Sequence, residues 1–224
     1  MTENLAPKAQ IIATGSELVL GQMVDTNSAW LSAYLASKGV RVVKHTTVGD
    51  ELAPLVEILR QSFRQFEVTV VTGGLGPTED DLTRVAVAKA LGLSLNFRPD
   101  LAEDLMASFL RRSYKISPNQ YRQAWLPQDT ELVKNRWGTA PAFCLDRPGR
   151  LMLFLPGVPA EMENITRSFL GPRLELKFGS KLGLVRTTIH RAAGLGEGLV
   201  DHKLGDLIRQ SLNPSLGLLA GPFE

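Results

Sequence analysis

Glycines and carboxylates recur after three short apolar runs of this chain. They form the stretches GSE at 15–17, GD at 49–50 and GGLGPTEDD at 73–81. Glycines there would let backbone N–H groups approach an anion, whereas Asp50, Asp80 and Asp81 would repel a bare phosphate. A bound Mg²⁺-like cation resolves this conflict, because that hard ion bridges carboxylates to substrate phosphates. The pattern therefore indicates a metal-assisted site for a nucleotide, with the three aspartates as candidate metal ligands.

The phosphate is expected at the start of a helix that begins at Thr78. The first turn of a helix presents free N–H groups and the positive end of the helix dipole. The preceding glycines, Gly73, Gly74 and Gly76, would add backbone N–H groups, and Thr78 would add a hydroxyl. We therefore expect these four residues to bind phosphate.

A purely structural interpretation of the same carboxylates also fits the sequence. The spacing Thr78-x-x-Asp81 resembles a capping box with Asp in place of the usual Glu or Gln. Acidic residues are also common in a first helical turn for dipole reasons alone. Asp50 could cap a helix that starts near Leu52, and Glu17 could be an ordinary exposed loop residue. Capping and chemistry can coexist at one residue, so both interpretations stay open here.

Other familiar motifs are absent or incomplete. GLG at 74–76 opens a G-x-G-x-x-G pattern, but Glu79 stands where the last glycine belongs, and no G-x-x-x-x-G-K-[ST] occurs. The three histidines are scattered without metal-ligand spacing, and no G-x-S-x-G elbow indicates a serine hydrolase. Cys144 lies beside Phe143 in a predicted strand, so we interpret it as a buried apolar residue and not as a nucleophile.

The elements that must position the candidate loops alternate between strand and helix. Strands are expected at 9–13, 40–48 and 68–72. Helices are expected from Asn27 or Ser28 to Gly39, at 52–66, and from Thr78 to Leu91. This order is typical of a doubly wound α/β sheet, in which ligands bind outside the carboxyl ends of the strands. The three loops would then meet at one sheet edge.

The later chain predicts more elements and a domain boundary. A helix is expected at 99–112, a hairpin across 143–155 and a helix at 160–170. The polar stretch 171–183 separates a first domain, 1–172, from a small α+β domain, 173–224. That second domain would contain strands at 184–190 and 216–220 around a helix at 196–209. The chain stops just past the last of these strands, so we expect the second domain to be truncated.

The composition is that of an ordinary globular protein. Hydrophobic residues make up 44% and charged residues 21%. A net charge of +2 is too small to indicate nucleic acid or a membrane surface as the main partner. No apolar run approaches the roughly 20 residues of a membrane helix. The single cysteine cannot form an internal disulfide, and no signal-peptide pattern is present. We therefore expect a cytoplasmic protein that binds a small-molecule nucleotide.

Seven motifs resemble those of the CinA-like branch of the MoaB/Mog (molybdopterin-binding-like) superfamily. They are TGSELVLG at 14–21, continuing through DTN at 25–27, then VGD at 48–50, TGGLGPTEDDLT at 72–83, NQYRQAWLP at 119–127, NRWGTAP at 135–141, LPGVPAEM at 155–162 and, less specifically, GLGE at 194–197. The motif at 72–83 matches nearly letter for letter. The resemblance without the last motif spans roughly Ala9 to Leu170.

The resemblance implies a three-layer α/β/α sandwich with a mostly parallel sheet, assembled as a homo-oligomer, a dimer or a trimer. It implies hydrolysis of ADP-ribose to AMP and ribose 5-phosphate, with a divalent metal, Mg²⁺ or Co²⁺, together with K⁺. The molybdopterin enzymes of the superfamily use aspartates that match Asp50 and Asp81 here. These two are therefore the candidate catalytic residues, and Asp80 is the next candidate metal ligand.

The motifs also imply further substrate-binding residues, namely Glu17, Asn27, Gly138, Thr139 and Gly157. Two departures from the family pattern concern Ser16, where many relatives have an acidic residue, and Ala142, where glycine is frequent. The nicotinamide-mononucleotide deamidase domain of many CinA proteins is not expected here. Two alternatives to the hydrolase stay open: molybdopterin binding or adenylyl transfer, and a nucleotide-binding regulatory module without turnover.

Overall fold

A computed structural model of the chain describes residues 6–111, 115, 117–183, 188–211 and 213–219. The chain separates into two compact units, residues 1–185 and residues 186–224. The first unit contains all the predicted site residues, so the fold is described mainly there.

The strands and helices predicted in the first unit occur in the predicted order, and further elements accompany them. The strands are β1 (Lys8–Thr14), β2 (Arg41–Val48), β3 (Val68–Thr72), β4 (Leu95–Phe97), β5 (Trp125–Pro127), β6 (Glu131–Val133), β7 (Ala142–Arg147) and β8 (Arg150–Leu155). The longer helices are α2 (Thr26–Ser37), α3 (Leu52–Gln65), α4 (Thr83–Leu91), α5 (Pro99–Arg111), α6 (Pro159–Ile165), α7 (Gly171–Phe178) and α8 (Glu197–Gln210). The short helical segments are α1 (Ser16–Val19), η1 (Pro118–Ala124), η2 (Thr166–Leu170) and η3 (Gly179–Lys181).

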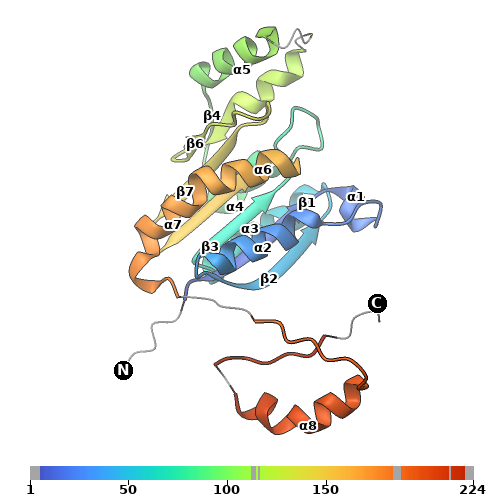
Figure 1. Cartoon of the computed structure of the whole chain (residues 1–224). Coiled ribbons are helices and arrows are strands. Elements are labelled where there is room, and N and C mark those ends of the chain that lie inside the picture. Colours follow the sequence, from blue (N-terminus) through green and yellow to red (C-terminus); the bar gives the residue numbers. More distant parts are fainter. Residues whose placement is uncertain (1–5, 112–114, 116, 184–187, 212, 220–224) are drawn as a thin grey trace. The chain divides into compact units, whose positions relative to one another are not determined.

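Six strands form one sheet in the order β2-β1-β3-β8-β7-β6 (Figure 1). β2, β1, β3 and β8 run parallel, whereas β7 and β6 are antiparallel to their neighbours. The predicted hairpin is the β7–β8 pair. β4 and β5 form a separate antiparallel pair. The predicted α/β class with a mostly parallel sheet is therefore confirmed.

The central strands of the sheet are buried on both faces, which explains why they are mostly apolar. Successive residues of β1 point to opposite sides: Ile11 belongs to the apolar cluster that contains residues of α2, α6 and α7, while Ile12 belongs to the cluster that contains residues of α3, α4 and α5. Both isoleucines are fully buried, and β3 is buried along its whole length. The two apolar clusters make the three layers of the predicted α/β/α sandwich.

The helix predicted at 160–170 continues further than expected. α6 passes through the π-helical turn η2 into α7, and Leu174 and Phe178 of α7 are buried in the core of the first unit. Pro172 lacks an N–H, and its position in the first turn of α7 avoids a lost helical hydrogen bond. The expected boundary after residue 172 therefore moves to residue 185.

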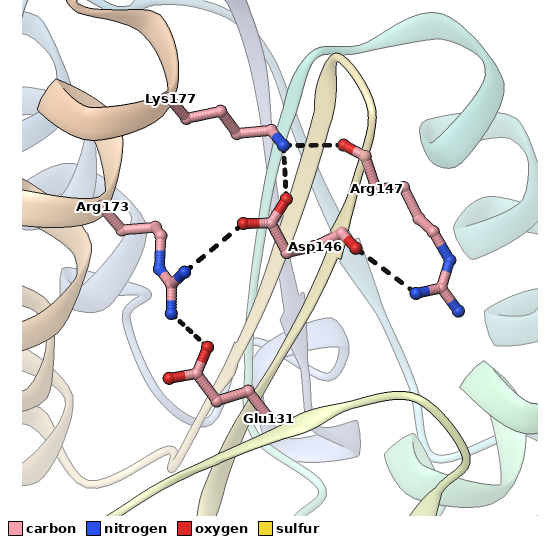
Figure 2. A network of polar contacts seen from close by, with 5 residues as sticks. All are labelled: Glu131, Asp146, Arg147, Arg173 and Lys177. Carbon is pink, nitrogen blue, oxygen red and sulfur yellow. Dashed lines mark hydrogen bonds and ion pairs between the residues drawn. The ribbon is translucent and has the colours of Figure 1, made fainter.

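Ionic contacts hold α7 against the antiparallel strands (Figure 2). Lys177 pairs with Asp146 and donates to the Arg147 carbonyl at 2.7 Å. Arg173 lies 3.6 Å from Asp146 and also pairs with Glu131. Asp146 precedes the turn into β8, so this network lies at the sheet edge where β8 begins.

The second unit contributes α8, which confirms the helix predicted at 196–209. Residues 188–190 and 216–219 form no strand, so these parts of the two predicted strands are not confirmed. Residues 184–187 and 220 lie outside the described part of the chain. Among the helices of the described residues, none is both long enough and apolar enough to cross a membrane.

Candidate functional site

Four parallel strands end at one edge of the sheet. Thr14 of β1 lies opposite Val48 of β2, while Thr72 of β3 lies opposite Ala13 of β1 and Leu155 of β8. The loops that follow these strands therefore leave the sheet side by side. As the sequence predicted, the glycine- and aspartate-containing segments start from this common edge.

Ser16 and Asp50 join the loops that follow β1 and β2. Asp50 Oδ2 accepts a hydrogen bond from the Ser16 N–H at 2.8 Å, and the Asp50 N–H donates to Ser16 Oγ at 3.1 Å. Asp50 does not cap α3, whose N-cap residue is Glu51. No described residue donates to Asp50 Oδ1. This oxygen is therefore available to a ligand.

Close backbone approach requires glycine at the end of β3. Gly73 and Gly74 have φ angles of +104° and +66°. A Cβ on Gly73 would lie 2.4 Å from the Thr14 carbonyl oxygen, and a Cβ on Gly74 would lie 2.3 Å from Thr83 Oγ1. A Cβ on Gly157 would lie 3.6 Å from Gly73 Cα. The loops after β1, β3 and β8 therefore pack directly on one another.

Asp81 organises the loop between β3 and α4. Its Oδ1 accepts from the Gly76 N–H at 2.7 Å, and its Oδ2 accepts from the Thr78 N–H at 2.8 Å and the Thr78 hydroxyl at 2.6 Å. The Asp81 N–H donates back to the Thr78 carbonyl at 3.3 Å. The helix start predicted at Thr78 is wrong: these bonds hold residues 76–81 in a turn, and α4 begins at Thr83.

Several N–H groups expected to bind phosphate are used within the chain. The Gly73 N–H donates to the Leu155 carbonyl at 3.0 Å, and those of Gly76 and Thr78 donate to Asp81. The N–H groups of Gly73 and Gly76 are therefore not free, and the Thr78 hydroxyl, which was expected to bind phosphate, also donates to Asp81 at 2.6 Å. The Gly74 N–H has no acceptor among the described residues. It remains a candidate phosphate donor, as the Thr78 side chain remains a candidate neighbour of the ligand.

Asn27 connects α2 to the ends of β3 and β8. Its Nδ2 donates to the Gly157 carbonyl at 2.8 Å and to Thr72 Oγ1 at 3.2 Å. Its Oδ1 is buried and has no partner among the described residues, so it could accept a hydrogen bond from a ligand hydroxyl. Neither predicted N-cap of α2 is correct, because Asp25 Oδ1 accepts from the Ser28 N–H at 2.9 Å.

The loop that contains Gly138 and Thr139 is tied to the start of α6. A Cβ on Gly138 would lie 2.0 Å from the Glu161 carboxyl carbon. Asn135 Oδ1 accepts from the Gly138 N–H at 3.0 Å, and Asn135 Nδ2 donates to Glu161 Oε2 at 2.5 Å. Because α6 starts just after Gly157, this loop is connected through α6 to the end of β8. Thr139 is half-buried in the same loop.

The remaining acidic candidates lie at the surface or turn back on their own loops. A Cβ on Gly15 would lie 2.4 Å from Glu17 Oε1, so the Glu17 side chain turns back against the backbone of Gly15. Arg122 pairs with Glu79 and lowers the pKa of that carboxyl. The Thr78 side chain lowers the pKa of Asp80. The carboxyls of Glu79 and Asp80 are therefore ionised at neutral pH, and they make the exposed part of the β3–α4 loop acidic.

The predicted metal ligands do not form a closed cage. Within the described ranges, no three His, Cys, Asp or Glu side chains gather into a group that could hold a metal ion. Asp50 follows β2 and Asp81 follows β3, with β1 between them, and the two share no hydrogen-bond partner in the described chain. Both carboxylate oxygens of Asp81 accept hydrogen bonds from its own loop, whereas only one oxygen of Asp50 has a partner among the described residues.

Sequence reasoning missed three side chains that hold these loops, namely Arg84, Gln123 and Glu161. Arg84 and Gln123 donate to carbonyls of the β3–α4 loop. A signal for Arg84 was present, because it is spaced three and four residues from Val87 and Ala88 on the buried face of α4. A cation at an apolar position indicates a buried polar contact.

Comparison with known proteins now identifies the family. Residues 10–176 match the family model described as "Probable molybdopterin binding domain". The chain belongs to this family. Within this family the chain is similar to CinA-like members. It is 30% identical in sequence to the protein CinA from Thermoplasma acidophilum, and the two structures match with a TM-score of 0.68 over 76% of this chain and 99% of that one.

Other relatives agree with this placement. A putative competence-damage inducible protein from Moorella thermoacetica is 38% identical over 97% of this chain and 52% of its own length. A CinA-like protein from Dictyoglomus thermophilum is 34% identical over 97% of this chain and 52% of its own length. The chain thus spans about half the length of these relatives. The fold is shared with a molybdopterin biosynthesis enzyme, MoaB, from Thermus thermophilus, at a TM-score of 0.51 and 21% identity.

Proposed function

We propose that this CinA-like domain is a metal-dependent nucleotide pyrophosphatase that hydrolyses ADP-ribose to AMP and ribose 5-phosphate. The observation that supports it best is the placement of Asp50. Its Oδ2 is fixed by Ser16, and its Oδ1 has no partner among the described residues. This carboxylate lies at the same sheet edge as the Gly73–Gly74 turn, where a diphosphate could approach the backbone.

The residues of the site would divide the work. Asp50 would hold the cation, and Asp81 would keep the β3–α4 loop in shape, with Asp80 as a second carboxylate near the ligand. The Gly74 N–H would donate to a phosphate oxygen, and Asn27 Oδ1 would accept from a ribose hydroxyl. A bound divalent ion, Mg²⁺ or Co²⁺, would supply charge neutralisation at the diphosphate and a lowered pKa for a coordinated water.

The reaction itself requires only water as co-substrate. The water oxygen forms a bond to one phosphorus, the P–O–P bond breaks, and the protons of the water are distributed between the product phosphates and solvent. AMP and ribose 5-phosphate then leave as separate anions. No histidine takes part in the proposed site, so a carboxylate would accept the proton from the water.

A second candidate function is binding of molybdopterin without hydrolysis. The description of the matching family model favours it. A nucleotide-binding regulatory module without turnover is closely related, because both would use the same phosphate contacts. In either case the domain would bind its ligand tightly and release it unchanged.

Calorimetric titration with ADP-ribose, followed by chromatography of the mixture, separates these functions. The titrations are run with Mg²⁺ or Co²⁺, each with and without K⁺. Metal-dependent appearance of AMP supports the hydrolase. Tight binding with no AMP supports the binding module, and absence of both overturns the proposal for ADP-ribose. Parallel titration with a molybdopterin tests the second candidate directly.

A further inference from the structure

Arg84 is a buried cation that has no carboxylate in direct contact among the described residues. Only 4% of the residue is exposed. NH1 donates to the Leu75 carbonyl and NH2 to the Gly76 carbonyl, both at 2.7 Å. Burial lowers the pKa of Arg84 to about 10, and the charge of Asp81 acts in the opposite direction. Burial of a charge without an oppositely charged partner is strongly unfavourable, so the burial of this guanidinium needs a structural explanation.

The peptide between Leu75 and Gly76 connects this cation to Asp81. Its carbonyl accepts from Arg84, and its N–H donates to Asp81 Oδ1 at 2.7 Å. In a trans peptide the C=O and N–H bonds point in opposite directions. The peptide dipole therefore lies with its negative end toward the guanidinium and its positive end toward the carboxylate. The guanidinium charge therefore strengthens the hydrogen bond from this peptide to Asp81, and the carboxylate charge strengthens the hydrogen bond from Arg84 to this peptide.

The rest of the loop supports the same arrangement. The Gly76 carbonyl also accepts from Arg84, and the nitrogen of that peptide belongs to Pro77, which has no N–H to satisfy. Gln123 donates to the Leu75 carbonyl at 3.2 Å, so this oxygen is bound from two sides. The buried side of the loop is therefore fixed by donors, while Asp81 fixes its outer side.

We propose that Arg84 is a positioning residue of the site, which acts on Asp81 through the Leu75–Gly76 peptide and holds the β3–α4 loop in the form that receives the diphosphate. This inference rests on the proposed function for its use in catalysis. The coupling between Arg84 and Asp81, which is the structural part of the inference, does not depend on any activity.

A double-mutant cycle in urea unfolding tests the coupling. Arg84→Met, Asp81→Asn and the double variant are compared with the unaltered protein. Because the two residues bind the same peptide, their effects should not be independent. The increase in the unfolding equilibrium constant of the double variant should be about fivefold smaller than the product of the two single increases. Additive effects would overturn the coupling. If Arg84→Met does not fold, Arg84→Lys replaces it, since an ammonium cannot bond both carbonyls in the same planar geometry.

Arg150 offers a matched control. Its NH1 donates to the Phe66 carbonyl at 3.0 Å and its NH2 to the Arg64 carbonyl at 2.8 Å, at the sheet edge where β8 begins. Arg150→Met therefore removes the same two kinds of bond far from the loop. Its effect on unfolding should be additive with that of Asp81→Asn. Coupling of equal size for Arg150 would show that the cycle reports general destabilisation and would overturn the inference.

Kinetics then test whether the coupling is used. Arg84→Met should lower kcat/KM for ADP-ribose by about tenfold or more, mainly through kcat, and Asp81→Asn should add little to that loss. Arg150→Met should leave both constants unchanged. Unchanged kcat and KM in folded Arg84→Met would overturn the positioning role. If the unaltered protein forms no AMP, the proposed function fails, and the unfolding cycle still decides the coupling.

Discussion

Ser16 and Asp50 exchange two hydrogen bonds across the ends of β1 and β2. The exchange uses one carboxylate oxygen of Asp50 and leaves the other without a partner in the described chain. The Ser16 backbone N–H thus orients the Asp50 carboxylate, and the Ser16 hydroxyl binds the Asp50 backbone N–H.

Asp50→Asn should weaken ligand binding while leaving the fold intact. The asparagine carbonyl can still accept from the Ser16 N–H, so the free energy of unfolding should change by less than about 1 kcal/mol. Loss of the charge should weaken the affinity for ADP-ribose in the presence of Mg²⁺ by about tenfold or more. Titration calorimetry and urea unfolding measure the two effects. Ser16→Ala, which keeps the carboxylate, is the control and should lose much less affinity.

Asp81→Asn should lose stability as well as activity. All three groups bonded to the Asp81 carboxylate are donors, and an asparagine would turn its own NH₂ toward at least one of them. The expected loss is about 1–3 kcal/mol in the free energy of unfolding. Asp80→Asn, on the exposed neighbour, should change stability by less than about 0.5 kcal/mol. Equal stability of both variants would show that Asp81 does not organise the loop.

Asp146→Asn should destabilise the fold without affecting the site. The substitution removes the carboxylate shared by Lys177 and Arg173, which leaves Lys177 with no carboxylate partner among the described residues and Arg173 with Glu131. A loss of about 1–3 kcal/mol in urea unfolding is expected, together with unchanged affinity for ADP-ribose. A large change in affinity would mean that α7 and the strand ends of the site are coupled, contrary to this account.

Cys144 should resist thiol reagents in the folded protein. The side chain is fully buried, and burial raises the pKa of the thiol to about 12 from the ordinary value of 9.0. At pH 8 the labelling rate should therefore be at least about 100-fold lower in buffer than in urea. Fast labelling without unfolding would contradict the burial of this strand.

The same shift sets a pH dependence of stability. Between about pH 9 and 12 the unfolded chain loses the Cys144 proton and the folded chain keeps it. The folded state then binds more protons, so the contribution of this thiol to the free energy of unfolding falls as the pH rises through that window. Urea unfolding of Cys144→Ala over the same range should lack this component.

The sequence predicted the elements that depend on hydrophobic pattern. β1, β2, β3, α2, α3 and α5 lie within a few residues of their expected bounds, because burial on one or both faces leaves a clear periodicity. The common edge for the aspartate-containing loops also followed from that order of elements. The TGGLGPTEDDLT motif added the family.

The errors arose where side chains override local pattern. The start of α4 moved from Thr78 to Thr83 because Asp81 binds the loop backbone, and no periodicity reports such bonds. The boundary moved past residue 172 because α7 buries Leu174 and Phe178 in the core, although the surrounding glycines and proline indicate a linker. The apolar face of α4 marks Arg84 as a buried cation, but its partners required coordinates, since they are carbonyls that no sequence pattern marks.

The central claim is that this domain hydrolyses ADP-ribose with a metal held by Asp50. The most direct test measures the products formed from ADP-ribose by the unaltered protein and by Asp50→Asn. Each protein is assayed with Mg²⁺ or Co²⁺ and after chelation of the metal. The account predicts equal amounts of AMP and ribose 5-phosphate from the unaltered protein, loss of both on chelation, and about 100-fold less product from Asp50→Asn. Equal product formation by the two proteins, with or without metal, would contradict it.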